Sequence, residues 1–141
     1  MERFDDSLGF LMTRTARCMK RALESRLAGH GITSSQYAVL YRLWEEDGLS
    51  LTELGKKLYF DNPTITGVVD RMERDNLVNR ERNNEDRRVI KIFLTSRGKE
   101  LKDVLIPLGP EVNRLATTNF SSEEKDRLKS FLERVWENIE G

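Results

Sequence analysis

Two groups of polar side chains near the middle of the chain have the types and spacing needed to bind nucleic acid. The first follows one side of a helix that the pattern predicts over residues 63–75, where hydroxyl groups give way to arginines. The second is Arg87 and Arg88, which end the polar, turn-forming run 83–88. Hydroxyl, backbone N–H and guanidinium groups are the donors that proteins present to phosphates and base edges. The pattern therefore favours contacts with double-stranded DNA.

Helix signals place the first group on an exposed surface. Ser50 and Glu53 have the spacing of a capping box, which predicts a short helix as far as Leu58. Asn62 is then expected as the N-cap of the second helix, with Pro63 as its first helical residue. The inner side of that helix is apolar at intervals of three and four residues, at Ile65, Val68, Val69 and Met72.

Two strands after this helix place the second group at the tip of a hairpin. Residues 89–94 alternate as a strand with one apolar side, and residues 77–82 alternate more loosely. A helix-turn-helix followed by such a hairpin is a winged helix, which would place its second helix in a major groove and the arginine tip in the adjacent minor groove. The residues expected to contact DNA are Asn62, Pro63, Thr64, Thr66, Gly67, Arg71, Arg80, Arg82, Asp86, Arg87, Arg88 and Lys91.

Three segments resemble the MarR family of bacterial transcription regulators in content and order. They are ITSSQYAVL, LTELGKKL and VVDRMERDNLVNRERNNEDRRVIKIFLTSRG. The pair Asp86 and Arg88, followed by Leu94 and Thr95, matches the wing pattern of that family. The resemblance implies a mainly α fold (an α+β winged helix) of about six helices and a small antiparallel hairpin, assembled as an intertwined homodimer. It also implies that Arg88 inserts into the groove and that Asp86 orients it or its neighbour.

Long amphipathic stretches flank the proposed DNA-binding unit. Residues 4–28 predict one helix, about 37 Å long at 1.5 Å per residue, with Cys18 on its apolar stripe. Such a helix is longer than a small winged-helix core can cover, so a second copy of the chain is the simplest cover for the rest. Pro107 and Pro110 predict a break near 106–110.

The last helix is expected after Ser121, where Glu124 completes a second capping box. Its broad apolar stripe carries a phenylalanine and a tryptophan that the fold of one chain would cover poorly. We therefore interpret residues 1–141 as one MarR-type domain, in which 1–31 and 96–141 form the dimerisation helices and 32–95 form the winged helix-turn-helix unit.

Composition limits the class of protein. Lys+Arg and Asp+Glu both number 24, which argues against an unspecific polycationic binder. Residues 50–99 nevertheless carry 11 basic against 8 acidic side chains, and the rest of the chain carries 13 against 16. One cysteine, no run of apolar residues long enough for a spanning helix and no secretory signal predict a cytoplasmic protein without membrane contact.

The family resemblance also implies a pocket for a small effector, commonly an aromatic or phenolic acid, between the dimerisation helices and the DNA-binding unit. Phe10, Tyr37 and Tyr41 could form aromatic walls, and Arg14 or Arg17 could pair with a carboxylate. Core or surface roles are the alternative for the same residues. The resulting hypothesis is a homodimeric repressor that binds a pseudo-palindromic operator and is released by the effector.

Other classes of function have weaker support in the sequence. A redox-sensing regulator would use Cys18, but burial on the apolar stripe would make that thiol unreactive. A winged helix that binds only protein would carry the same elements without contacting DNA. An enzyme, a metal site or a cofactor is not expected, because the chain has one histidine, one cysteine and no phosphate-binding glycine loop.

Overall fold

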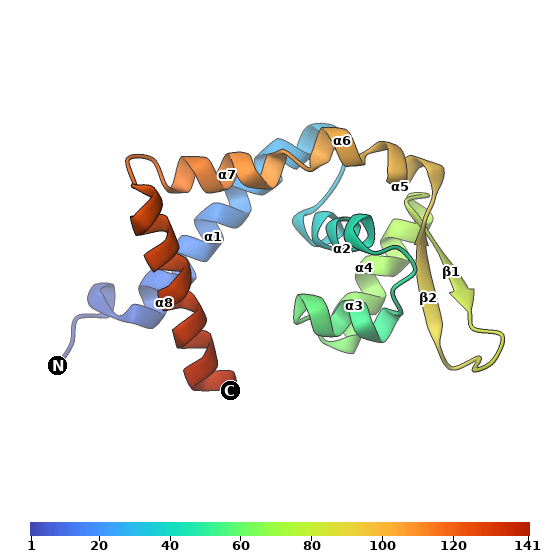
Figure 1. Cartoon of the computed structure of the whole chain (residues 1–141), viewed down its shortest axis with the longest axis horizontal. Helices are drawn as coiled ribbons and strands as arrows, with labels where there is room; N and C mark the ends of the chain where they lie inside the picture. Colours follow the sequence, from blue (N-terminus) through green and yellow to red (C-terminus); the bar gives the residue numbers. More distant parts are fainter.

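The computed structural model describes residues 1–141 and separates the chain into two regions (Figure 1). We call residues 32–95 the head, and helices α1, α7 and α8 the arm. In chain order the elements are η1 (Phe4–Asp6), α1 (Leu8–Leu27), η2 (Ala28–His30), α2 (Ser34–Glu45), α3 (Leu51–Leu58), α4 (Asn62–Arg74), β1 (Val78–Arg82), β2 (Ile90–Leu94), α5 (Ser96–Glu100), α6 (Lys102–Leu105), α7 (Leu108–Ala116) and α8 (Ser122–Glu140).

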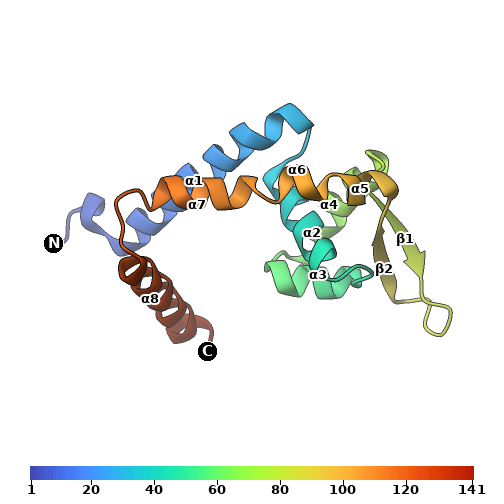
Figure 2. The same cartoon turned by 45° about the horizontal axis from the view of Figure 1, so that its top comes forward.

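The fold is mainly helical with one antiparallel hairpin, which confirms the fold class expected from the sequence. The turned view in Figure 2 shows α5 and α6 joining the head to the arm, with the hairpin at the far end of the molecule from α8. None of the helices has the length and apolar character needed to cross a membrane.

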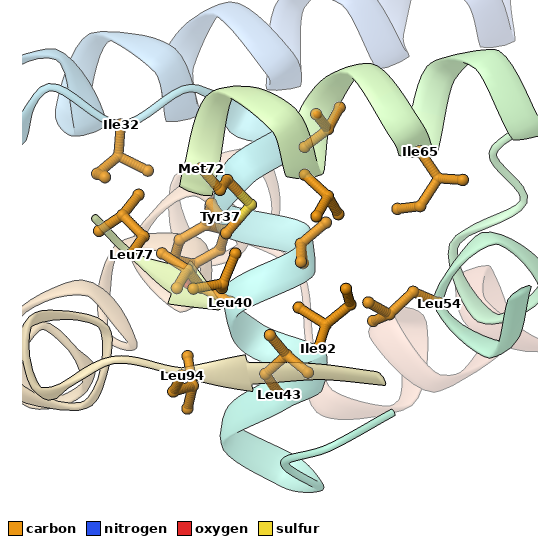
Figure 3. Packing of buried hydrophobic residues seen from close by; sticks show 14 of the residues in the cluster. Ile32, Tyr37, Leu40, Leu43, Leu54, Ile65, Met72, Leu77, Ile92 and Leu94 are labelled. Atoms are coloured by element: carbon orange, nitrogen blue, oxygen red, sulfur yellow. The ribbon is translucent and has the colours of Figure 1, made fainter. Parts of the chain in front are cut away.

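Nearly all of the hydrophobic core belongs to the head. One cluster of 17 buried residues contains only two, Leu27 and Leu105, from outside residues 32–94. Figure 3 shows α2 in its centre, with Leu40 and Leu43 between the side chains of α4 and those of β2. Helix α2 is held at its start by a capping box, in which the Gln36 N–H donates to Thr33 Oγ1 at 3.1 Å and the Thr33 N–H donates to Gln36 Oε1.

An isolated β-bridge that the sequence did not reveal joins the hairpin to the rest of the head. The Ile92 N–H donates to the Leu49 carbonyl at 2.9 Å, and Ser50 pairs with Lys91 as an antiparallel bridge. On the other edge, β1 pairs with β2 in the register Val78 to Leu94 through Arg82 to Ile90. The inner side chains of the wing are therefore held in the same core as α2 and α4.

The helical region after the wing is broken, as its prolines predicted. Thr95 caps α5, with Oγ1 accepting from the Gly98 N–H at 3.1 Å. The helix then ends and restarts at Ile106 and Pro107, between α6 and α7. The predicted capping box is also present at the start of α8, where Ser121 and Glu124 exchange hydrogen bonds.

Two expectations about the first helix are wrong. It begins at Leu8 rather than at residue 4, because the extended backbone of Ser7 separates it from the short turn η1. Its apolar stripe is fully buried only at Leu27, and Cys18 is exposed. The stripe is uncovered because α7 is the arm helix that packs along α1, while α8 turns away (Figure 1).

Candidate nucleic-acid interface

Helix α4 has one side in the core and the other exposed to solvent. Ile65, Val68, Val69 and Met72 are each at most 1% exposed, and they fix how the helix is rotated about its axis. This rotation leaves Pro63, Thr64, Asp70 and Arg71 exposed, with Thr66 and Gly67 half-buried beside them. The helix therefore presents the hydroxyl and guanidinium groups that the sequence predicted on one outer face.

The start of α4 differs by one residue from the expectation. Asp61, not Asn62, is the N-cap, because its Oδ1 accepts from the Thr64 N–H at 2.8 Å. Asn62 is the first helical residue and Pro63 the second, where a missing N–H is equally harmless. Hydrogen bonding to the Thr64 side chain, and then to its backbone N–H, lowers the pKa of the Asp61 carboxyl.

The tip of the wing is a loop folded by its own hydrogen bonds. The Asn83 N–H donates to the Val89 carbonyl at 2.9 Å, and the Val89 N–H donates to the Asp86 carbonyl at 3.0 Å. Asn83 Oδ1 accepts from the Glu85 N–H at 2.8 Å. Arg82 closes the turn by donating from Nη1 to the Arg87 carbonyl at 2.8 Å. These hydrogen bonds hold the loop that carries Arg87 and Arg88 in one conformation.

The Arg88 side chain projects from this loop into solvent, and Asp86 holds its guanidinium in place. Its Nε and Nη2 donate to Asp86 Oδ1 and Oδ2 at 3.1 and 3.2 Å, although the Arg88 side chain is 91% exposed. Hydrogen bonds from the Arg88 side chain, and then from its backbone, hold the pKa of Asp86 below its usual value. Of the two arginines that Asp86 was expected to orient, the structure shows that it contacts Arg88.

Arg80 occupies a different position from the other predicted contacts. It is paired with Asp70 and Glu73 of α4, and its Nη1 donates to Glu73 Oε1 at 3.0 Å. The Arg80 backbone N–H also donates to Glu73 Oε2. These contacts join β1 to the outer face of α4 and compensate the negative charge of Asp70, which would otherwise oppose a phosphate. Sequence reasoning did not find this cluster, because its members come from two elements.

Lys91 and Arg82, two further residues predicted to contact DNA, differ in whether the side chain already makes a hydrogen bond within the wing. Lys91 is exposed on β2, opposite Glu81 in the hairpin register. Arg82 is exposed too, but its Nη1 is committed to the loop carbonyl of Arg87. A backbone phosphate contact from this side of the wing is therefore better supported for Lys91.

The structure divides the predicted effector pocket into two cavities. Phe10, Arg14 and Arg17 line an open groove of about 670 Å³ on α1, with the Arg14 guanidinium 5.5 Å from the centre of the Phe10 ring. Tyr37 and Tyr41 line a separate cavity of about 360 Å³ between α1, α2 and α3. The five residues therefore do not line one pocket within a single chain, because Arg14 and Arg17 lie on the part of α1 that extends beyond the head.

No cluster of three or more histidine, cysteine, aspartate or glutamate side chains is placed to hold a metal ion. Cys18 lies against a small groove formed with Met19, Val112 and Leu115. Arg21 Nη2 lies 3.2 Å from its Sγ.

A helix-turn-helix whose second helix is exposed on its outer face, followed by a hairpin with arginines at its tip, defines a winged-helix DNA-binding protein. The MarR family model matches residues 32–90, which make up most of the head. The organic hydroperoxide resistance transcriptional regulator of Bacillus subtilis (strain 168) is 32% identical over 137 residues, covering 97% of this chain and 92% of that protein. The chain therefore belongs to the MarR family of transcriptional regulators.

Two further comparisons agree with this assignment. The HTH-type transcriptional regulator TtmR of Methylorubrum extorquens (strain PA1) is 43% identical over 98 residues, covering 70% of this chain but only half of that protein's length. The crystal structure of a MarR mutant from E. coli in complex with operator DNA superposes with a TM-score of 0.85 at 27% identity, covering 91% of this chain and 92% of that one. The names of these relatives are those of regulators, not of enzymes.

Proposed function

We propose that the chain acts as a homodimeric, sequence-specific repressor that binds a pseudo-palindromic operator. The observation that carries the proposal is the Arg80 cluster, which attaches the hairpin to the outer face of α4 and so presents Thr64, Arg71 and Arg88 as parts of one surface. In this arrangement α4 lies in a major groove and Arg88 in the neighbouring minor groove, with Asp86 limiting the conformations of its guanidinium.

The dimer is supported by the apolar side chains of the arm. On α8 the exposed apolar residues follow one stripe, formed by Leu128, Phe131, Leu132, Trp136 and Ile139. Leu8 of α1 and Leu115 of α7 are exposed as well. An apolar surface that runs over three helices favours an interface, and a second copy of the same arm would cover it. Two-fold symmetry then places the half-site centres about 10 bp apart, or a small multiple of a turn.

A small aromatic acid is the effector class that the grooves favour. Arg14 and Arg17 have no ion-pair partner in the chain, and Phe10 offers a ring beside them. In the second cavity, by contrast, Arg42 already pairs with Glu45 at 3.4 Å. The groove on α1 is therefore the better site for a carboxylate. Isothermal titration with a panel of benzoic and phenolic acids, using the wild type and Arg17→Ala, tests this assignment.

Selection of bound fragments from random DNA by the purified protein tests the main proposal. The expected result is a pseudo-palindrome with the stated spacing, and a linear fall of log K with log salt. No enrichment, or binding without a salt dependence, would instead indicate a winged helix that contacts only protein.

A thiol-based switch is a second candidate, because Cys18 is exposed rather than buried. Exposure gives oxidants access to the sulfur, and one relative is named for organic hydroperoxide resistance. A stoichiometric hydroperoxide should then abolish operator binding by the wild type but not by Cys18→Ser. Equal loss in both proteins would reject this candidate.

A further inference from the structure

The break between α6 and α7 contains a side chain from the head. The hydroxyl of Tyr37, on α2, donates to the Ile106 carbonyl at 3.0 Å and accepts from the Gly109 N–H at 3.1 Å. One phenol oxygen thus takes the place of two backbone hydrogen-bond partners, one for the Ile106 carbonyl and one for the Gly109 N–H, where the chain passes from head to arm.

The need for this oxygen follows from the prolines. In an uninterrupted helix the Ile106 carbonyl would accept from the N–H of residue 110, but Pro110 has none. The Gly109 N–H would bond to the Leu105 carbonyl, but the break moves it away, and it donates to Tyr37 instead. Without the hydroxyl, both groups would lose their partner at a half-buried site, which is unfavourable.

The fit of the phenol depends on the glycine. A Cβ at Gly109 would lie 2.9 Å from the Tyr37 oxygen, closer than real Cβ atoms approach a neighbour. The Tyr37 ring is itself 6% exposed, and the rings of Tyr41 and Trp44 lie edge-on to it at 5.8 and 6.3 Å. The Tyr37 hydroxyl is protonated at neutral pH in any case, and burial raises its pKa further.

We propose that Tyr37 is a positioning residue for DNA binding, whose hydroxyl sets the angle at which the arm leaves the head. The proposal rests on the dimeric DNA-binding function proposed above. In a dimer joined through its arms, the angle at this break determines how far apart the two α4 helices lie. Tyr37 therefore acts on operator binding through the arm, without being one of the residues predicted to contact DNA.

The chain crosses between head and arm at only one other place, the turn η2 with Gly29 and Gly31. Leu27 and Ile32 on either side of this turn are buried, but a Cβ at either glycine would meet no atom within 4 Å, so no side chain packs against the two glycines. At Ile106, by contrast, the Tyr37 side chain of the head hydrogen-bonds to the backbone of the break itself. Because of this difference between the two crossings, we assign control of the angle between head and arm to Tyr37.

The first test is Tyr37→Phe, which removes only the hydroxyl, with Tyr41→Phe as the matched control on the same helix. Operator affinity should fall about threefold to tenfold for Tyr37→Phe, which corresponds to one net hydrogen bond. The slope of log K against log salt should stay at the wild-type value, since no phosphate contact is lost. Tyr41→Phe should bind as the wild type does.

The second test measures the spacing of the heads directly. A spin label at Asn84→Cys, in a Cys18→Ser background, reports the distance between the two wing tips of a dimer by double electron–electron resonance. The distribution should be narrow with Tyr37 and broader with Tyr37→Phe. Gly109→Ala, which displaces the phenol while leaving its hydroxyl intact, should broaden it in the same way.

Pro110→Ala separates positioning from local stability. It restores an N–H for the Ile106 carbonyl, so the double variant Tyr37→Phe/Pro110→Ala should regain thermal stability while its distance distribution stays broad. If the double variant regains both, the hydroxyl only satisfies local backbone groups, and the positioning role is overturned. Wild-type affinity and width for Tyr37→Phe would overturn it too. A wild type that neither dimerises nor binds DNA would overturn the proposed function itself.

Discussion

The head and the arm differ in how completely each buries its own apolar side chains. In the head, the four positions expected on the inner side of α4 are all buried, and the buried side-chain polar atoms all have a hydrogen-bond partner. In the arm, α8 has no buried residue at all, although it carries Phe131 and Trp136. Within one chain, the head buries the apolar side chains on the inner faces of its helices, whereas the arm leaves most of its own exposed.

This difference shows where the chain depends on a partner. Burial of apolar area is the main favourable term in folding, and most of it within one chain lies in the head. In the proposed dimer, the arm would gain its missing burial from the second copy. The residues predicted to contact DNA all lie in the head, and the exposed apolar stripe lies in the arm. A regulator built in this way can change the spacing of its heads without unfolding either of them.

The largest expected effect comes from opening a cavity in the head. Leu40 is fully buried in the middle of the core, so Leu40→Ala should lower the free energy of unfolding by about 2–5 kcal/mol. Urea denaturation followed by circular dichroism measures the loss. Val104→Ala, at an exposed apolar position, is the control and should change stability by less than about 1 kcal/mol. Equal losses at both positions would show that Leu40 is no more tightly packed than an exposed apolar residue.

Truncation in the arm should affect pairing rather than folding of the head. Phe131 is 47% exposed in the single chain, and Phe131→Ala should weaken the dimer by about 2 kcal/mol, a roughly 30-fold rise in Kd. Sedimentation equilibrium measures the change, with Lys129→Ala on the same helix as the control. A dimer unaffected by Phe131→Ala would show that the stripe on α8 is not its interface.

A smaller effect is expected at the tip of the wing, where affinity changes without any loss of fold. Arg88→Ala should weaken operator binding by about 1–3 kcal/mol and relax the preference for the flanking base pairs. Fluorescence anisotropy at moderate salt, with the operator and a scrambled duplex, measures both. An unchanged preference would mean that Arg88 does not enter the groove.

The smallest effect is a pH dependence confined to the head, where both carboxyls with lowered pKa values lie, Asp61 and Asp86. A carboxyl whose pKa is lower in the folded state stabilises the fold above its unfolded pKa, and this stability is lost as pH falls through the folded pKa. Unfolding free energy should therefore decrease between about pH 5 and about pH 2. Asp61→Asn keeps a capping oxygen but does not titrate, so its pH profile should be flatter than that of the wild type.

Much of the fold could be predicted because it follows from local chemistry. The capping boxes at Ser50 and Ser121, the spacing of Ile65 and Met72, and the break at Pro107 each depend on residues within about one or two turns of one another. The wing followed from alternation and from its polar turn. The N-cap of α4 was misplaced by one residue, because Asp61 and Asn62 are both good caps and local sequence does not choose between them.

The sequence by itself determined the elements of this protein, its apolar faces and the arginines at the wing tip, because these depend on neighbours along the chain. Only the tertiary structure showed that Arg80 pairs with α4, that Cys18 is exposed, that Arg14 and Tyr37 line different grooves and that Tyr37 fills the break beside Gly109. Each of these facts joins residues from different elements or depends on what covers a helix. Periodicity describes one helix at a time, and it does not say which face another part of the chain will cover.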